Sequence, residues 1–336
     1  MLISLLALGF VGAAGQPPVF VGPRERPMAA DVTGAVSAER CAATVDALCG
    51  FGTRHTLSPD APDRGNAAAR AWIKGELEKA GPALRVTVEE FTSARTQRLP
   101  AGARVYNVVA ALPGSMKEAE QRRYYVVGHY DSINGDRADA KGDAPGANDD
   151  ASGVAVVLEC ARVLAEKKLD ATVVFLAAGG EEQGLVGASF HAQAAAQRGE
   201  RIAAVLNNDI VGDPSPPVWT SHREAAAGSR RRSLDRADSH FPTVRLFSEG
   251  VPKGLSETER ERYRLEGAES DSPSRQLARF VPAVAERERT AIRPLLVFRQ
   301  DRFLRGGDHA AFNEAGFAAV RFTVPGEDYT RQHANV

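Results

Sequence analysis

A chain of 336 residues with 43% hydrophobic and 25% charged side chains is long and apolar enough to bury a sizeable core, which excludes a disordered or fibrous protein. Its formal net charge of −1 gives no whole-protein attraction to nucleic acid or to an anionic membrane. We therefore expect no nucleic-acid partner, and we look for the substrate in a local site.

The chain opens with a short apolar run, Leu2 to Val11, followed by small residues and Gln16-Pro17-Pro18. Such a run is too short to span a bilayer and is typical of a cleaved secretory signal, although no Lys or Arg precedes it. We predict a signal peptide over residues 1–15, a tether over 16–36 and a secreted or periplasmic protein without stable membrane insertion. The alternative is a buried N-terminal strand.

Two helices and two strands are expected next. Ser37 is a suitable N-cap for an amphipathic helix over 37–48, and a second helix over 65–79 ends at a glycine and a proline. Apolar residues over 84–91 and 105–112 follow the pattern of β-strands.

From Tyr124 onward, apolar strands alternate with helices. We expect strands over 124–127, 171–177 and 202–206, separated by helices over 153–167 and 184–198. This alternation predicts βαβ units, a parallel sheet and an α/β fold. In such sheets ligands bind beyond the carboxyl ends of the strands.

Residues from about 213 to 267 interrupt this pattern with Pro214, Pro216, Pro217 and a basic run, and we expect them to leave the sheet. They either form a rim over the pocket or a solvated face. The pattern returns with a helix over 272–286 and strands over 294–298 and 318–323.

Residues that follow the predicted strands carry the donor types of a zinc site, namely His129, Asp149, Glu182, Asp209 and His309. An all-oxygen set would instead suggest magnesium or calcium. Five ligands are too many for one tetrahedral ion, so we predict two metals that share a bridging carboxylate. Asp149 is the expected bridge, because its turn lies between the two halves of the set.

Neighbouring carboxylates complete this chemistry. Asp131 lies two residues after His129, so in an extended segment it points to the same side and accepts the second imidazole N–H. Glu181 and Glu182 are adjacent, so one can bind metal while the other takes a proton from water and delivers it to a leaving amine. Asp150 is left with a local role as a cap or loop support.

Each signal has a plainer explanation when taken alone. A His-x-Asp pair is a common coincidence, an Asp pair is often a helix cap, and a Glu pair often begins a solvated helix. Together, in order and at strand ends, they favour a site. The chain contains no G-x-S-x-G, no phosphate-binding loop and no G-x-G-x-x-G turn.

Five motifs together resemble the co-catalytic di-zinc exopeptidases, which include secreted bacterial aminopeptidases, glutamate carboxypeptidases and glutaminyl cyclases. The motifs are GHYDS (128–132), PGANDDASG (145–153), EEQGLVGA (181–188), NND (207–209) and GGDHAAF (306–312). The resemblance covers about 40–335. It implies a three-layer αβα sandwich around a mostly parallel mixed sheet, as a single peptidase domain over 37–336.

The resemblance also implies residue roles. His129 and Asp209 would hold one zinc, Glu182 and His309 the other, with Asp149 as the bridge. Glu181 would be the general base.

The chain departs from the family pattern at two places. Gly307 stands where the family usually has Ser, beside an intact Asp-His pair. The segment from Tyr329 to His333 resembles the family's closing Tyr-and-His segment, yet the chain stops at Val336, before the last helix such proteins usually carry. We therefore expect either a fragment, truncated at the C-terminus, or a short final layer, with His333 either lining the pocket or in a tail.

These observations predict a secreted zinc-dependent aminopeptidase with two Zn²⁺ per chain, acting on peptides with a free N-terminus. A glutaminyl cyclase or carboxypeptidase of the same family is the first alternative. The second is a non-catalytic binding ectodomain that kept the fold.

Overall fold

The computed structural model describes residues 27–118, 121–212, 243–303, 305–327 and 332–334. The predicted signal peptide and the first part of the predicted tether lie outside these residues. None of the helices in the described part of the chain has the length and apolar character needed to cross a membrane.

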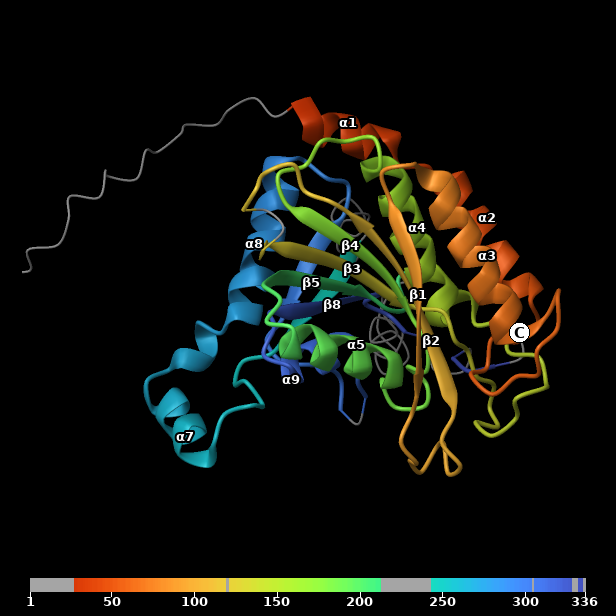
Figure 1. Cartoon of the computed structure of the whole chain (residues 1–336). Helices are drawn as coiled ribbons and strands as arrows, with labels where there is room; N and C mark the ends of the chain where they lie inside the picture. The colour runs from red at the N-terminus through yellow and green to blue at the C-terminus, as the bar shows by residue number, and fades with distance from the viewer. Residues whose placement is uncertain (1–26, 119–120, 213–242, 304, 328–331, 335–336) are drawn as a thin grey trace, which may run out of the picture.

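The centre of the fold is an eight-stranded mixed sheet in the order β1-β2-β4-β3-β5-β8-β6-β7 (Figure 1). The strands are β1 Arg85–Thr92, β2 Arg104–Leu112, β3 Arg123–His129, β4 Thr172–Ala178, β5 Ile202–Asn208, β6 Thr243–Ser248, β7 Arg293–Val297 and β8 Ala319–Thr323. The four central strands β4, β3, β5 and β8 run parallel. Their carboxyl ends therefore meet at one edge of the sheet.

Helices cover both faces of the sheet, which confirms the three-layer α/β fold (Figure 1). One face carries α2 Ala38–Gly50, α3 Gly65–Ala80 and α4 Ser152–Leu164, and the other carries α5 Val186–Gln197 and α9 His309–Glu314. In β8, Ala319 packs with α5 and α9, whereas Val320 packs with α8 (Pro273–Arg287). Because successive strand residues face opposite ways, α8 lies on the face of α4.

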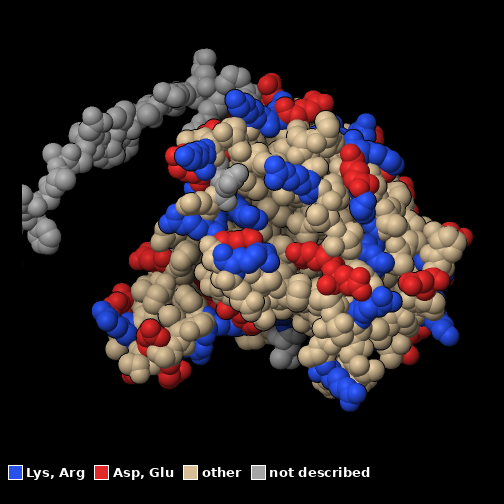
Figure 2. Space-filling view, in the orientation of Figure 1, with Lys and Arg blue, Asp and Glu red and all other residues tan. Residues whose placement is uncertain are grey.

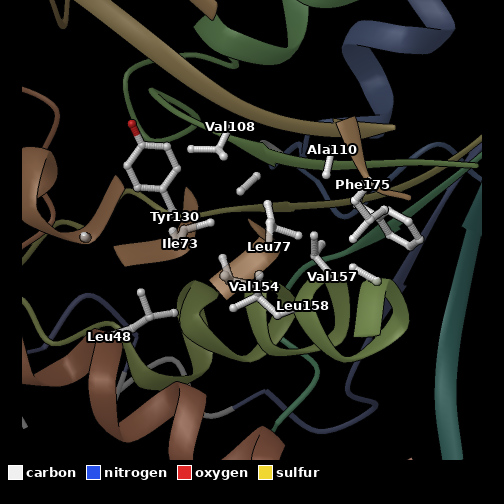
Figure 3. Close-up of a cluster of buried hydrophobic side chains, with 14 of the residues drawn as sticks. Leu48, Ile73, Leu77, Val108, Ala110, Tyr130, Val154, Val157, Leu158 and Phe175 are labelled. Carbon is white, nitrogen blue, oxygen red and sulfur yellow. The ribbon is translucent and has the colours of Figure 1, made fainter. Parts of the chain in front are cut away.

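The main core fills the space between α2, α3, α4 and the sheet, where the labelled side chains converge (Figure 3). Leu77 of α3, Val154 of α4 and Phe175 of β4 are all fully buried. Burial of each such side chain stabilises the fold by about 2 kcal/mol. Along α4 the buried residues recur at helical spacing, which explains why the sequence pattern predicted this helix correctly.

Two glycines allow α4 to begin against the sheet. A Cβ on Gly128 of β3 would lie 2.7 Å from the carbonyl carbon of Gly153, and a Cβ on Gly153 would lie 2.1 Å from the Asn208 carbonyl oxygen. Neither position has room for a side chain. This close approach brings the turn before α4 to the carboxyl ends of β3 and β5.

Two sequence-based boundaries need correction. Residues 243–248, inside the segment expected to leave the sheet, form β6, because their alternating apolar residues pair with β7 and β8. Part of the predicted tether is the helix α1, Pro27–Ala35. The residue that caps α2 contacts α4, because the Ser37 N–H donates to the Glu159 carboxylate at 2.7 Å.

Between β6 and α8, residues Glu257–Leu265 form the exposed helix α7.

Basic and acidic side chains are interspersed over the face shown in Figure 2, with neither sign dominating it. On this face the distribution agrees with the net charge of −1.

Candidate active site

Charged residues gather at the carboxyl ends of the parallel strands. His129 ends β3, Glu181 and Glu182 follow β4, Asp209 follows β5, and His333 lies beyond β8. These strand ends border a cavity of about 360 Å³. Its lining residues are Arg98, Arg137, Asp149, Glu181, Glu182, Gly184, Leu185, Asp209, Arg302, Arg305, Gly306, Arg321, Gln332 and His333.

Among the residues that the structure describes, the possible metal ligands fall into two groups, within each of which the ligand atoms lie within 4.8 Å of one another. The first group is His129, Glu181 and Asp209, and the second is Asp149, Glu182 and His333.

Asp149 joins the two groups through its two carboxylate oxygens. Oδ1 lies 3.1 Å from His129 Nε2, and Oδ2 lies 3.2 Å from His333 Nε2. The Gln332 side chain also donates to Oδ2 at 2.9 Å. Asp149 therefore contacts an imidazole of each group, and its role as a bridging metal ligand stays a prediction.

His309, which was predicted to bind the second metal, does not reach the site, and this prediction is wrong. It is the first residue of α9, it is fully buried, and its Nε2 lies 2.8 Å from the carbonyl oxygen of Gln300 and 3.5 Å from Asp301. Burial lowers the pKa of His309, so a neutral imidazole is favoured there. The start of α9 turns its side chain away from the pocket lining.

His333 takes the position that had been expected for His309. Its Nε2 lies 3.0 Å from Glu182 Oε1 as well as 3.2 Å from Asp149. Burial lowers the pKa of His333, but the hydrogen bonds and charges of Asp149 and Glu182 outweigh burial and raise it to about 9. The sequence signal for His333 was its place in a closing Tyr-and-His segment rather than any periodicity.

Asp131 positions the glutamates as well as His129. Its two carboxylate oxygens accept the backbone N–H groups of Glu181 and Glu182, each at 3.1 Å. His129 Nδ1 lies 3.1 Å from the main-chain oxygen of Asp131 and 3.6 Å from its carboxylate. The predicted contact therefore runs through the Asp131 main chain, while the side chain fixes the loop after β4.

Asp150 has the local role that the sequence predicted. Its carboxylate accepts the backbone N–H groups of Gly153 at 2.9 Å, His129 at 3.1 Å and Ile210 at 3.2 Å. It thus caps α4 and ties that helix to the ends of β3 and β5. The peptide bond between Asp149 and Asp150 is cis.

Glu181 lies in the first ligand group and lines the cavity. Burial raises the pKa of the Glu181 carboxyl well above its ordinary value, and the neighbouring Glu182, Asp209 and Asp308 carboxylates raise it further. A raised pKa suits a group that must accept a proton near neutral pH.

Arg54 is a supporting residue that the sequence did not single out. Its guanidinium is fully buried and donates to the main-chain oxygens of Tyr130 at 2.7 Å and Gly146 at 2.9 Å, and also to those of Leu48 and Pro145. One side chain therefore holds the segments that carry His129 and Asp149. A basic residue in a short polar turn gives no sequence signal for such a role.

Arg321 supports Asp209 from within β8. It is fully buried and bonds to Asp209 Oδ1 at 2.8 Å and to Asp301 Oδ2 at 2.9 Å. Burial lowers the pKa of Arg321, but the two carboxylates outweigh it and the pKa is raised. The visible signal was a charged residue in an otherwise apolar strand.

The donor set fits zinc. Four carboxylates and two imidazoles converge on the cavity floor, and Glu182 Oε1 is buried with His333 Nε2 3.0 Å away. Mixed imidazole and carboxylate ligands are those that zinc prefers. Divalent cations would also offset the crowding of negative charge on the floor.

A two-centre ligand set at the strand ends of an αβα fold is the arrangement of a metal-dependent hydrolase. The sequence profile of peptidase family M28 matches residues 107–251. A probable zinc metalloprotease of Pyricularia oryzae is 44% identical over 310 residues, which cover 90% of this chain and 58% of that protein. Another from Pyrenophora tritici-repentis is 39% identical over 313 residues, covering 91% and 68%. The chain belongs to peptidase family M28.

Solved structures agree on the fold. The Legionella pneumophila LapA aminopeptidase superposes with a TM-score of 0.60 at 16% identity, covering 99% of this chain and 73% of that one. The Porphyromonas gingivalis glutaminyl cyclase gives 0.55 at 17% identity, covering 90% and 91%. This chain thus spans only about three fifths of the Pyricularia relative, but nine tenths of the cyclase.

Proposed function

We propose that this protein is a zinc-dependent aminopeptidase that binds two Zn²⁺ per chain and hydrolyses the first peptide bond of peptides. The observation that carries the proposal is the position of Asp149, whose two oxygens face the imidazoles of both ligand groups. His129 and Asp209 would hold one ion, Glu182 and His333 the other, and Asp149 would contact both.

Two zinc ions held there would supply Lewis acidity to the reacting water and the scissile carbonyl. Glu181 takes the proton of the attacking water and returns it to the leaving amine, which its place in the cavity beside both ligand groups supports. Asp131 fixes Glu181 for this task, because it holds the backbone N–H of that residue. Arg321 orients Asp209 through its contact with Asp209 Oδ1.

We also propose that the protein is exported through the signal peptide predicted over residues 1–15, which fits a peptidase acting on external peptides. Expression of the full chain in a secreting host, followed by N-terminal sequencing of the recovered protein, tests this. Cleavage near residue 15 is expected. Recovery of an intact N-terminus from the cytoplasm would contradict export.

One substrate panel tests the activity. Zinc-loaded protein is given an aminoacyl-anilide, its N-acetylated twin and a peptide with N-terminal glutamine, and zinc content is measured in parallel. An aminopeptidase releases the aniline only from the substrate with a free α-amine, whereas a glutaminyl cyclase closes the N-terminal glutamine to a ring with loss of ammonia and without hydrolysis of a peptide bond. A carboxypeptidase would cleave neither anilide, because both lack a free C-terminal carboxylate, and would instead release the C-terminal residue of the glutaminyl peptide. Zinc binding without turnover of any substrate would leave a binding ectodomain.

A further inference from the structure

The mouth of the cavity is basic, although its floor is acidic. Three separate segments bring arginines to the lining, namely Arg98 from the β1–β2 connection, Arg137 from the loop after β3 and Arg305 from the loop before α9. All three are exposed side chains. The floor, by contrast, is made of the carboxylates that zinc would balance.

The guanidinium groups differ in how they are neutralised. Arg302 pairs with Asp301 and Glu327, so its charge is compensated inside the protein. Arg98 donates to the main-chain oxygen of Glu182, which is a neutral acceptor. Within the described ranges, neither Arg98 nor Arg137 forms an ion pair with a carboxylate. With two divalent ions on the floor, positive charge would remain at the mouth.

The lining offers little to an apolar substrate. Leu185 is its only large apolar side chain in the part of the chain that the structure describes, beside Gly184 and Gly306. A pocket selective for a large apolar residue is instead lined mainly by aliphatic and aromatic groups. The cavity of about 360 Å³ has room for one substrate residue and its flanking groups.

We propose that the pocket selects peptides that carry a carboxylate beside the scissile bond, and that Arg98 and Arg137 bind this carboxylate. Guanidinium groups bind carboxylates through paired N–H donors, and such charge-assisted contacts are stronger than neutral ones. The inference rests on the proposed function, because the metal groups define where the scissile bond lies. The carboxylate belongs either to the side chain of an acidic N-terminal residue or to the C-terminus of a dipeptide.

Matched substrates separate the two sources. Glutamyl-anilide and glutaminyl-anilide differ only in side-chain charge, and alanyl-alanine and its C-terminal amide differ only in the terminal carboxylate. We expect kcat/KM to favour the carboxylate-bearing member of at least one pair by about tenfold or more. A difference in kcat/KM within the first pair shows that an acidic side chain is recognised. A difference within the second pair shows that a C-terminal carboxylate is recognised. Equal rates within both pairs would overturn the proposal.

Substitution identifies the binding groups. Arg98→Gln and Arg137→Gln should each reduce the charge preference several-fold, whereas Arg95→Gln, an exposed arginine of the same connection outside the lining, should keep it. The ratio within a pair is the readout, because loss of the Arg98 bond to Glu182 can also lower the activity on every substrate. An unchanged ratio in both Arg98→Gln and Arg137→Gln would exclude these arginines.

A binding measurement keeps this inference separate from the proposed function. Calorimetry measures how tightly the zinc-loaded protein binds the α-amide of glutamate and the α-amide of glutamine. The same comparison is made between alanyl-alanine and its C-terminal amide. If no substrate is hydrolysed, the aminopeptidase proposal fails. Tighter binding of a carboxylate-bearing probe would still support the proposal that Arg98 and Arg137 bind a carboxylate. Hydrolysis without charge preference would retain the function and reject the selectivity.

Discussion

Two hollows in this protein differ in both size and lining. The site cavity of about 360 Å³ is lined largely by charged side chains, whereas a groove of about 1450 Å³ between α4 and α8 is lined mainly by apolar residues such as Leu206, Leu277 and Phe322. Strand residues that alternate onto the sheet face build the groove, and loops beyond the strand ends build the site. The proposed active site is therefore the smaller hollow, because charged side chains converge there, and not the hollow with the larger volume.

The largest expected effect is the loss of the residue that joins the two ligand groups. Asp149→Asn should lower zinc content from two ions to about none, because one oxygen faces each group, and should abolish turnover. Elemental analysis of protein purified with zinc gives the count. Asp143→Asn, an exposed change in the preceding loop, is the control and should retain both ions. Full zinc content in Asp149→Asn would contradict the bridging role.

A second variant separates chemistry from metal binding within the same cavity. Glu181→Gln should keep two zinc ions and lose about 100- to 10,000-fold in kcat, because the amide cannot accept the proton of the attacking water. Steady-state kinetics and elemental analysis are performed on the same preparation. Wild-type kcat in this variant would end the assignment of Glu181 as general base.

The third prediction concerns the support beneath the site. Arg54→Met should weaken zinc binding by about 10- to 100-fold and lower the free energy of unfolding by about 2 to 4 kcal/mol, because several buried main-chain oxygens lose their donor. Zinc titration with a competing chelator and urea unfolding measure the two effects. Loss of stability without loss of zinc affinity would show that Arg54 supports the fold alone.

The buried carboxyl of Glu249, which lines neither hollow, should make the stability of the fold depend on pH. Burial raises the pKa of Glu249 to about 7, so the folded protein favours the protonated form. The free energy of unfolding should therefore fall as pH rises from about 4.5 to 7, and the loss should be complete above 7. Glu249→Gln should be more stable than wild type by about 1 to 2 kcal/mol at pH 8, since Lys253 and solvent screen part of the charge, and equal at pH 4. An identical difference at both pH values would contradict this.

The smallest effect is expected in the large apolar groove. Phe280→Ser, at a lining side chain that is 61% exposed, should leave zinc content unchanged, kcat/KM within about twofold and unfolding within about 0.5 kcal/mol. A large loss of kcat/KM would show that the groove acts on the site and would weaken the contrast between the two hollows.

The sequence predicted most of the fold because its central strands and helices have strong periodicity. Helix α4 and strand β5 begin and end within three residues of the expected positions. Strand β6 was missed because prolines and charged residues surround a six-residue strand, and its pairing with β8 is a long-range contact. Local patterns do not reveal such pairings.

The site was predictable where a ligand directly follows a strand or the turn of a βαβ unit. His129 is the last residue of β3, and Glu182 and Asp209 follow the neighbouring parallel strands β4 and β5, so the topology alone brings them together. The same argument did not indicate whether His309 or His333 binds the second metal. Which of them reaches Glu182 depends on how the segments around α9 and beyond β8 fold in three dimensions, and neither segment has a periodic pattern.

Anomalous diffraction at the zinc edge from crystals of the zinc-loaded protein tests the central claim most directly. We expect two peaks on either side of the Asp149 carboxylate, one beside His129 and Asp209 and the other beside Glu182 and His333. A single peak, or a peak coordinated by His309, would contradict the proposed two-metal site.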